Sequence, residues 1–422
     1  MDYQKTTLPN GLRLLTREMP HTRSASIIFL FGVGSRYESD AEAGLSHFIE
    51  HMRFKGTERR PQAQDISAAI EGVGGILNAG TNQESTIYWA KVAQPHFSLA
   101  LDLLVDMLRH ARMDPKEVEK ERSVILEEIH ITYDNPGDLV SLLVDQILWP
   151  GHPLGRDIAG LPETVARFTR EDLIKYAERH YTPDNTVVSV AGKISHQGVL
   201  DEVSRLLGDW QGHANGAFLP ATDDQSHPRL KLYYKGIEQA NVCLGLPGLN
   251  NDHPDRFVLG TLNTILGEGM SSRLFLEIRE KRALAYDVHS FVNLFRDTGS
   301  TVIYAGVDPK RAAETLKAIL AEIERFVTTP VPEEEITKAK EFTKGRLLLG
   351  LEDSRSVASW LGSQELTSGR ILSVDEVVAQ IEAVTAADIQ RVARSLFTPQ
   401  RLNLAVVGPF KKETPFAKLL GM

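Results

Sequence analysis

Two histidines and a glutamate near the N-terminus have the residue types and the spacing of a catalytic metal site. His47, Glu50 and His51 form the pattern H-x-x-E-H, the reverse of the commoner H-E-x-x-H order. On a helix, residues four apart share one face, so both imidazoles can reach one ion. Zinc binds neutral imidazole nitrogens and, in catalytic sites, leaves one position for water. Glu50, beside that water, could accept its proton as a general base.

The segment around these residues has the apolar period of a helix. Leu45, Phe48, Ile49 and Met52 recur at i, i+3, i+4 and i+7, which predicts an amphipathic helix with the polar residues on its other side. The alternative is a pair of surface histidines on a solvated helix face. A protein zinc site needs a third ligand, and the motif alone does not supply one.

A later helix carries a stripe of glutamates. The residues 114–117, Asp-Pro-Lys-Glu, are typical of a helix start, with Asp at the cap and Pro at the first position. Along the helix that follows, Glu117, Glu121 and Glu128 recur at four- and seven-residue steps and so share one face. Such a stripe is more often a solvated acidic face than a set of metal ligands. The residues alone leave both interpretations open.

Between the two glutamate-bearing helices the chain has the pattern of a β-hairpin. Residues 76–81 and 86–92 are typical of paired strands and are joined by a polar turn. Residues 24–34 are a further β-rich segment, and helices are expected over 62–73 and 95–112. The first half therefore mixes strands and helices.

The second half of the chain repeats the first. A near-constant offset relates several segments, which are Tyr181-Thr182-Pro183 to Phe397-Thr398-Pro399, Val190-Ala191-Gly192 to Val406-Val407-Gly408, and the pair Thr169 and Asp172 to Thr385 and Asp388. Such an offset over most of each half indicates the duplication of one domain and not a short-period solenoid.

This repeat predicts an α+β protein with two homologous domains, each a mostly antiparallel sheet flanked by helices. The expected domains are residues 1–212 and 229–422, and the segment 213–228, rich in Gly, Ala, Asp and His, is the expected linker. The H-x-x-E-H pattern occurs in the first copy and is absent from the second. Only the first domain can therefore carry the metal.

Composition and charge describe a soluble globular protein. Of its 422 residues, 42% are hydrophobic and 24% are charged. The 47 Lys and Arg against 56 Asp and Glu give a net charge of -9, so nucleic-acid binding is not expected. The apolar run nearest the N-terminus, residues 27–31, is far short of a membrane span, and the first residues of the sequence lack the charged and apolar regions typical of a signal peptide. The single cysteine, Cys243, excludes an intrachain disulfide. We expect a cytoplasmic protein without a membrane partner.

Four motifs occur in order along the chain. They are GLSHFIEHMRFKGT at 44–57, GGILNA at 74–79 with Thr81 and Glu84, ERSVILEE at 121–128, and GMSSRLF at 269–275 with REKRALAY at 279–286. Together they resemble the pitrilysin/insulinase superfamily of zinc peptidases with the inverted motif. Within it, the chain is most similar to the short bacterial relatives of mitochondrial processing peptidase. Four ordered motifs are far more specific than H-x-x-E-H alone.

The resemblance implies a complete zinc site. In the family, a glutamate on the later helix is the third ligand, and a glutamate two turns earlier supports the site; Glu128 and Glu121 match these positions. Glu127 would point about 100 degrees away from them and is not expected to bind the metal. The implied ligands of one Zn²⁺ per chain are His47, His51 and Glu128, with Glu50 as the general base and Glu121 as the residue that supports the ligands.

The resemblance also implies groups that bind the substrate. Arg279 and Tyr286 match an Arg and a Tyr that lie near the family's catalytic centre, where they can stabilise a developing oxyanion. The family's edge strand, on which an extended peptide pairs by backbone hydrogen bonds, is matched by Ile76, Leu77, Asn78 and Ala79. Without the resemblance, these would be a surface arginine, a half-buried tyrosine and an ordinary edge strand.

The implied activity is that of a zinc-dependent endopeptidase. Its substrates would be unfolded peptides bound as an added β-strand in an enclosed chamber. Short chains of the family pair so that the zinc half of one subunit faces the Arg/Tyr half of the other, which implies a homodimer with shared sites. The alternative is a catalytically weak peptide-binding or processing subunit that needs a different partner chain. Catalytically inactive, peptide-binding members typically lack part of the metal site, whereas this chain has all of it. The zinc motif together with the Arg/Tyr pair argues against the need for a different partner chain.

Overall fold

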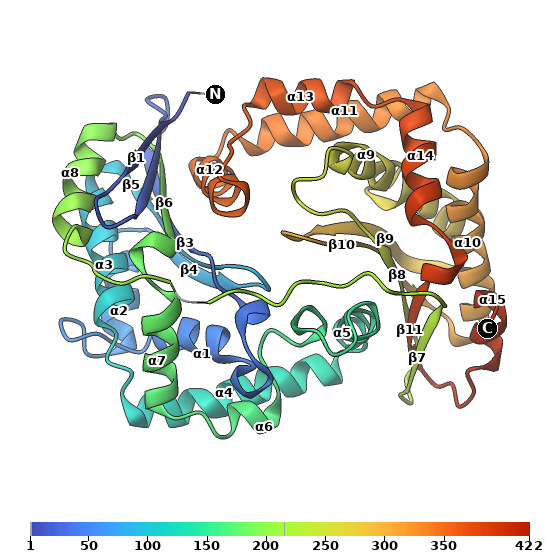
Figure 1. Cartoon of the computed structure of the whole chain (residues 1–422), viewed down its shortest axis with the longest axis horizontal. Coiled ribbons are helices and arrows are strands. Elements are labelled where there is room, and N and C mark those ends of the chain that lie inside the picture. The colour runs from blue at the N-terminus through green and yellow to red at the C-terminus, as the bar shows by residue number, and fades with distance from the viewer. Residues whose placement is uncertain (1, 215) are drawn as a thin grey trace. The chain divides into compact units, whose positions relative to one another are not determined.

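The computed structural model describes residues 2–214 and 216–422, which form two compact units (Figure 1). Unit 1 comprises Met1–His130, Asp157–Leu219 and Leu348–Leu372. Unit 2 comprises Ile131–Arg156, Pro220–Leu347 and Ser373–Met422. Each unit therefore contains segments from both halves of the sequence. In the described part of the chain, no helix combines the length and the apolar character needed to cross a membrane.

Unit 1, over the residues described, is built on a six-stranded sheet with the order β1-β2-β6-β3-β5-β4. Its strands are β1 (Gln4–Thr7), β2 (Arg13–Glu18), β3 (Ser24–Phe31), β4 (Ile76–Thr81), β5 (Thr86–Ala93) and β6 (Thr186–Gly192). Neighbouring strands are antiparallel except β2 and β6, which are parallel. The central strands β3 and β6 are buried along nearly their whole length, as expected where both faces of a sheet are covered. This order places β4 at an edge.

The helices around this sheet come mostly from the first half of the chain. They are α1 (Leu45–Met52), α2 (Ala63–Glu71), α3 (Phe97–His110), α6 (Pro162–Val165), α7 (Arg170–His180) and α8 (His196–Leu207), together with most of α4 (Pro115–Asp134) and the later helix α12 (Ser354–Ser368). The start of α4 at Pro115 agrees with the predicted cap, because the Asp114 carboxylate accepts a hydrogen bond from the Lys116 backbone N–H.

Unit 2, in its described residues, is built on a five-stranded sheet with the order β7-β11-β8-β10-β9. Its strands are β7 (Arg229–Tyr234), β8 (Ala240–Pro247), β9 (Ala285–Leu294), β10 (Gly299–Val307) and β11 (Asn403–Gly408). The pair β7 and β11 is parallel and the other pairs are antiparallel. The longer helices of this unit are α5 (Pro136–Leu148), α9 (Arg256–Gly267), α10 (Ala312–Thr328), most of α11 (Glu333–Gly350), α13 (Val374–Glu382), α14 (Ala386–Leu396) and α15 (Thr414–Leu420).

The two sheets share one topology, which confirms the α+β fold with two mostly antiparallel sheets. The strands β2-β6-β3-β5-β4 have the same order and the same parallel first pair as β7-β11-β8-β10-β9. The repeated Thr and Asp residues also cap a helix in both halves. Capping boxes are formed at the start of α7 by Thr169 with Asp172 and at the start of α14 by Thr385 with Asp388.

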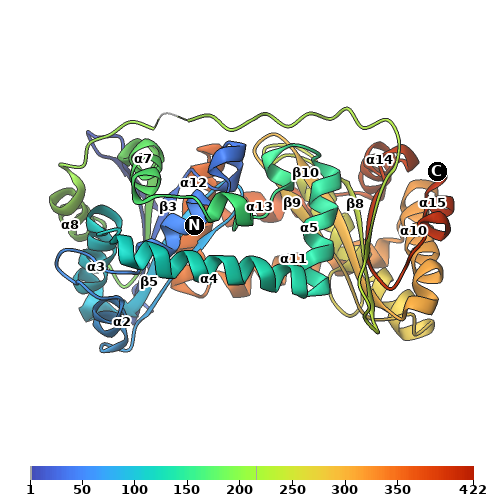
Figure 2. The ribbon, with the colours of Figure 1, turned by 90° about the horizontal axis from the view of Figure 1, so that it is seen from below.

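One face of each sheet is covered by a helix from the other half of the sequence (Figures 1 and 2). On unit 1, α12 buries Val357, Ala358 and Leu361 against side chains of β2, β3, β5 and β6. On unit 2, α5 buries Leu139, Leu143 and Val144 against β8, β10 and β11. The compact units follow this packing and so differ from the repeat copies 1–212 and 229–422, whose boundaries stay a prediction.

Candidate metal centre

The helix that carries the H-x-x-E-H motif, α1, is fixed by its apolar side. The four apolar residues that set its period are all buried. The three polar residues of the motif remain partly exposed. Because burial of the apolar stripe sets the rotation of the helix, the polar side is left open for chemistry.

The N-terminus of α1 is capped from a distance by Glu38. Gly44, just before the helix, has a φ of 102°, and a Cβ there would lie 2.6 Å from the Ala159 carbonyl oxygen; both features require glycine. Glycine has no capping side chain. Instead the buried carboxylate of Glu38 accepts hydrogen bonds from the backbone N–H groups of Gly44 at 2.8 Å and Ser46 at 2.7 Å. A negative charge here satisfies free N–H groups and the helix dipole. Glu38 is not among the residues predicted from the sequence.

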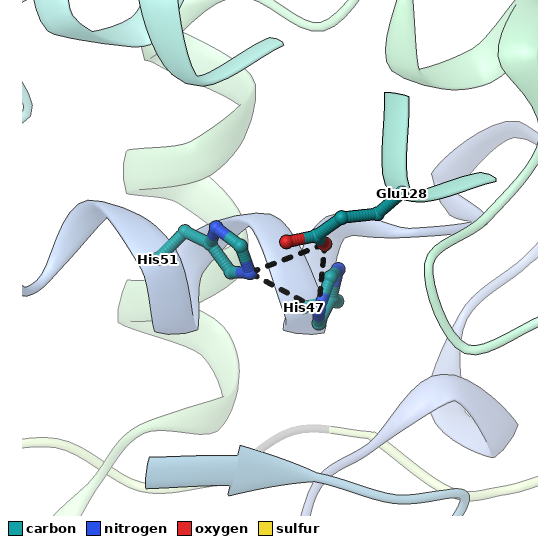
Figure 3. A group of neighbouring side chains, drawn as sticks. All are labelled: His47, His51 and Glu128. Atoms are coloured by element: carbon teal, nitrogen blue, oxygen red, sulfur yellow. Dashed lines mark hydrogen bonds and ion pairs between the residues drawn. The ribbon is translucent and has the colours of Figure 1, made fainter. Parts of the chain in front are cut away.

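The two motif histidines point their Nε2 atoms toward each other (Figure 3). These nitrogens are 3.2 Å apart. Two nitrogens bound to one tetrahedral zinc at about 2.0–2.1 Å are about 3.3 Å apart, so the pair has the spacing of metal ligands. His51 Nδ1 lies 2.8 Å from Glu121 Oε1, so this nitrogen carries the proton and the Nε2 lone pair is available. His47 Nδ1 is buried and, among the described residues, has no hydrogen-bond partner.

Glu128 completes a group of three donors. Its Oε2 lies 3.7 Å from His47 Nε2 and 3.6 Å from His51 Nε2 (Figure 3). Two atoms that are each about 2.0–2.2 Å from one ion can be at most about 4.3 Å apart, so all three separations fit one bound ion. Two imidazoles and a carboxylate are also a donor set typical of catalytic zinc. The structure thus brings together the three implied ligands as a group that could hold a metal.

The helix α4 presents Glu121 and Glu128 to this group and turns Glu127 away from it. Glu121 has a side chain only 5% exposed, accepts the hydrogen bond of His51, and pairs with Lys55 Nζ at 2.6 Å. The Glu127 side chain is 73% exposed, and its carboxylate lies 3.8 Å from His130. This difference follows from the helical period, because residues seven apart share a face and adjacent residues do not.

Burial and neighbouring charges set the pKa values of this group. Burial, together with the nearby His51, lowers the pKa of His47 to about 4, so His47 is neutral at pH 7, as a metal ligand must be. Burial by itself lowers the pKa of His51, but the hydrogen bond to Glu121 and the charge of Glu128 raise it above its usual value. Burial by itself raises the pKa of Glu121, but the hydrogen bonds from His51 and Lys55 lower it. The hydrogen bond between His51 and Glu121 therefore opposes the effect of burial on both groups.

Glu50 lies beside the three donors and is held by a separate contact. Its Oε2 accepts a hydrogen bond from Thr81 Oγ1 at 2.5 Å. Burial raises the pKa of Glu50, although the hydrogen bonds from Thr81 oppose this shift. A carboxyl group with a raised pKa can accept a proton and release it again closer to neutral pH.

The residues predicted to bind substrate lie on the edge strand β4. Among the described strands, β4 pairs with β5 alone, with Ile76 opposite Lys91 and Thr81 opposite Thr86. Ile76 is 55% exposed, and Asn78 Oδ1 accepts a hydrogen bond from the Ala79 backbone N–H. The outer edge of such a strand can accept a further strand by backbone hydrogen bonds. Residues 76–79 thus share a strand with Thr81, the partner of Glu50.

Arg279 and Tyr286 lie together in unit 2, whereas the three donors belong to unit 1. Arg279 is in a π-helical segment, Phe275–Lys281, and Tyr286 is near the start of β9 and 77% exposed. The Arg279 guanidinium lies 4.9 Å from the ring centre of Tyr286 and 4.8 Å from that of Phe275. Such cation–π contacts hold the guanidinium in place. Phe275 is thus a third member of this cluster, and its four-residue spacing from Arg279 is the sequence signal that could have indicated it.

Two family models match most of the chain. Residues 13–161 match the family described as "Insulinase (Peptidase family M16)", and residues 167–342 match the "Peptidase M16 inactive domain". The curated relatives include an uncharacterized zinc protease of Streptomyces coelicolor, 39% identical over 97% of this chain and 90% of the relative. The uncharacterized zinc protease YmxG of Bacillus subtilis is 38% identical over 96% of this chain and 98% of its own length.

Solved structures show the same fold. A protease from Helicobacter pylori superposes with a TM-score of 0.91 at 24% identity and covers 96% of this chain and 99% of that one. A protein from Pseudomonas fluorescens, described as a peptidase M16 inactive domain, superposes with a TM-score of 0.90 at 18% identity, over 97% of this chain and 99% of that one. At these identities the likeness concerns the fold alone.

Proposed function

The chain belongs to peptidase family M16, the insulinase family, and on this basis we propose that it is a zinc-dependent endopeptidase that hydrolyses peptide bonds in unfolded peptides. The observation that carries the proposal is the convergence of His47, His51 and Glu128, with Glu50 beside them and Glu121 behind His51. The zinc protease names of the relatives support the same metal.

Each residue of the centre has a distinct part in this proposal. A zinc ion held by the three donors, one per chain, would polarise the peptide carbonyl and lower the pKa of a bound water. Glu50 accepts the proton of the attacking water and then donates it to the leaving amine. Glu121, which pairs with Lys55, keeps His51 protonated on Nδ1. The lone pair of His51 Nε2 is then free to bind the ion.

The proposed substrate is an extended peptide that adds to the outer edge of β4. Backbone groups of residues 76–79 would pair with the peptide, and such pairing depends little on the side chains of the substrate. The position of β4 supports this binding mode, because its last residue contacts Glu50. A peptide paired with β4 would thus lie along the strand whose last residue, Thr81, contacts Glu50. Loose sequence preference and a requirement for an unfolded substrate follow from this mode.

Arg279 and Tyr286 are proposed to stabilise the oxyanion that develops on the peptide carbonyl. The cation–π contacts of Arg279 with Phe275 and Tyr286 support the role, because a guanidinium held in place loses little freedom when it binds. Following the resemblance, we place them in a homodimer, where the pair from one subunit serves the zinc centre of the other inside a closed chamber. Such an enclosure would exclude folded proteins.

The decisive experiment combines zinc analysis with peptide cleavage. The purified chain should contain about one zinc per chain and cleave a quenched peptide library. Removal of the zinc with a chelator should abolish cleavage, and added zinc should restore it. A zinc-loaded chain that cleaves nothing would reject the proposal. Cleavage that appears only after a different protein is added would favour the alternative, a processing subunit that needs a partner.

A further inference from the structure

Thr81 links the edge strand β4 to the side chain of Glu50. Its Oγ1 donates a hydrogen bond to Glu50 Oε2 at 2.5 Å. Thr81 is the last residue of β4 and pairs with Thr86 of β5. Both Thr81 and Glu50 are partly exposed, so the contact lies at the open side of the centre. A short hydrogen bond to an ionised carboxylate is among the stronger ones in proteins.

The backbone around Thr81 is held rigidly by the turn that follows. The Asn82 side chain accepts hydrogen bonds from the backbone N–H groups of Glu84 at 2.8 Å and Ser85 at 2.7 Å. The backbone N–H groups of Ser35 and Arg36 donate to the carbonyl oxygens of Asn82 and Gln83 at 3.2 and 2.8 Å. Each of these contacts fixes the chain within four residues of Thr81.

A buried ion pair anchors the same turn. The Arg36 guanidinium lies 2.5 Å from the Glu84 carboxylate, and both residues are buried. Gly34 lets the backbones approach, because a Cβ there would lie 2.1 Å from the Asn82 carbonyl oxygen. A hydroxyl on so constrained a backbone can hold its partner in one orientation. Glu84 and Arg36 therefore fix the position of Thr81, and Thr81 fixes Glu50.

We propose that Thr81 is a positioning residue for Glu50. Its hydroxyl holds one carboxylate oxygen, Oε2, and thereby leaves Oε1 to take and return the proton of the reaction. Because Thr81 ends the strand on which the peptide pairs, one rigid element sets both the path of the substrate and the direction of the base. This inference rests on the proposed function, since it gives Thr81 a part in that reaction.

The test compares two substitutions that differ in the hydroxyl. Thr81→Val keeps the shape, the β-branched side chain and the backbone N–H but removes the hydroxyl donor, whereas Thr81→Ser keeps that hydroxyl. For Thr81→Val we expect kcat to fall about 10- to 100-fold, with KM within about twofold and the zinc content unchanged, as for other residues that orient a catalytic group. Thr81→Ser should restore kcat to within about threefold of wild type.

Two controls separate positioning from loss of structure. Thr86→Val removes a buried hydroxyl from the paired strand, where it donates to the Val33 carbonyl oxygen at 2.9 Å. Ser290→Ala removes a hydroxyl that donates at 2.7 Å from the edge strand β9 to Asn263 of α9, a strand-to-helix contact within unit 2. Both should leave kcat of the folded enzyme unchanged, even where they lower its stability.

A crystal structure of Thr81→Val supplies a readout that does not depend on activity. The Glu50 carboxylate should leave its wild-type orientation or occupy several, and Thr81→Ser should restore it. A Glu50 carboxylate that keeps its place in Thr81→Val, or a wild-type kcat for that variant, would overturn the inference and leave the proposed function intact. If Glu50 moves as expected but the zinc-loaded wild type cleaves no peptide, the positioning role stands and the proposed function fails.

Discussion

The helices that precede the two edge strands differ in what they expose, although the two sheets repeat one topology. In unit 1, α1 precedes β4, and its polar side with Glu50 and the two histidines is partly exposed. In unit 2, α9 precedes β9 and is buried throughout Thr261–Gly267. The two sheets are thus similar scaffolds, and among the residues that the structure describes the group that could hold a metal lies on the α1 side. A position in the repeated fold can bind a metal only where its polar side chains are accessible to solvent and point toward one another.

Each unit has a side-chain hydrogen bond from its edge strand to such a helix, but the two bonds lie at different strand positions and differ in character. In unit 1, Thr81 donates to Glu50, a carboxylate that is partly exposed. In unit 2, Ser290 donates to Asn263, and both residues are buried. A buried hydroxyl-to-amide bond satisfies two polar groups and stabilises the packing. The same bond made to a partly exposed carboxylate can also direct a reactive group.

The largest expected effect concerns the reactive group of α1. Glu50→Gln keeps the size of the side chain and its hydrogen bond from Thr81 but removes the base. Peptide cleavage should fall by about 10²- to 10⁴-fold, while zinc stays near one per chain, because Glu50 lies outside the three donors. Zinc analysis and kcat on one fluorogenic peptide check both parts. Activity close to wild type would mean that Glu50 is not the general base.

The next effect distinguishes two adjacent glutamates of α4. Glu128→Gln should weaken zinc binding by more than about 100-fold, because it removes a direct ligand. Glu127→Gln is the matched control and should bind zinc like wild type, since its side chain is 73% exposed and lies against His130. Competition with a chromophoric chelator measures both affinities. Zinc loss in the Glu127 variant alone would show that the register of α4 is wrong.

The third prediction asks whether the two units cooperate between subunits. Chains with Glu50→Gln and chains with Tyr286→Phe should each be nearly inactive alone. After subunit exchange about half of the dimers are mixed, and each mixed dimer has one site with both defects and one with none. About a quarter of wild-type activity should therefore return. No recovery after verified exchange, or a fully active monomer, would contradict the shared site.

The smallest effect concerns the helices exchanged between the two halves of the sequence. Leu361→Ala in α12 removes a fully buried side chain and should lower the free energy of unfolding by about 2–5 kcal/mol. Hydrogen exchange should become faster in β3 and β6 of unit 1, because α12 covers these strands. Leu143→Ala in α5 is the counterpart and should affect β8 and β11 of unit 2. Equal acceleration in both sheets after either change would contradict the division into two units.

The local elements and the repeat were predictable from the amino-acid sequence. Apolar periods and caps gave α1, α4 and the hairpin of β4 and β5, whose first strand has the predicted bounds 76–81. Both predicted Thr and Asp pairs became capping boxes. These features were predictable because helix periods, strand alternation and caps depend on residues only a few positions apart. The order of motifs likewise indicated the family that the comparisons show.

The contacts between residues far apart in the sequence became known from the folded structure. The cap of α1 by Glu38, the support of Glu121 by Lys55, and the bond from Thr81 to Glu50 join residues from separate elements. The exchange of α5 and α12 between the two sheets is likewise invisible in the repeat pattern. Such contacts depend on how buried faces fit together in space, and a linear pattern of residue types records which face is apolar but not which partner will cover it.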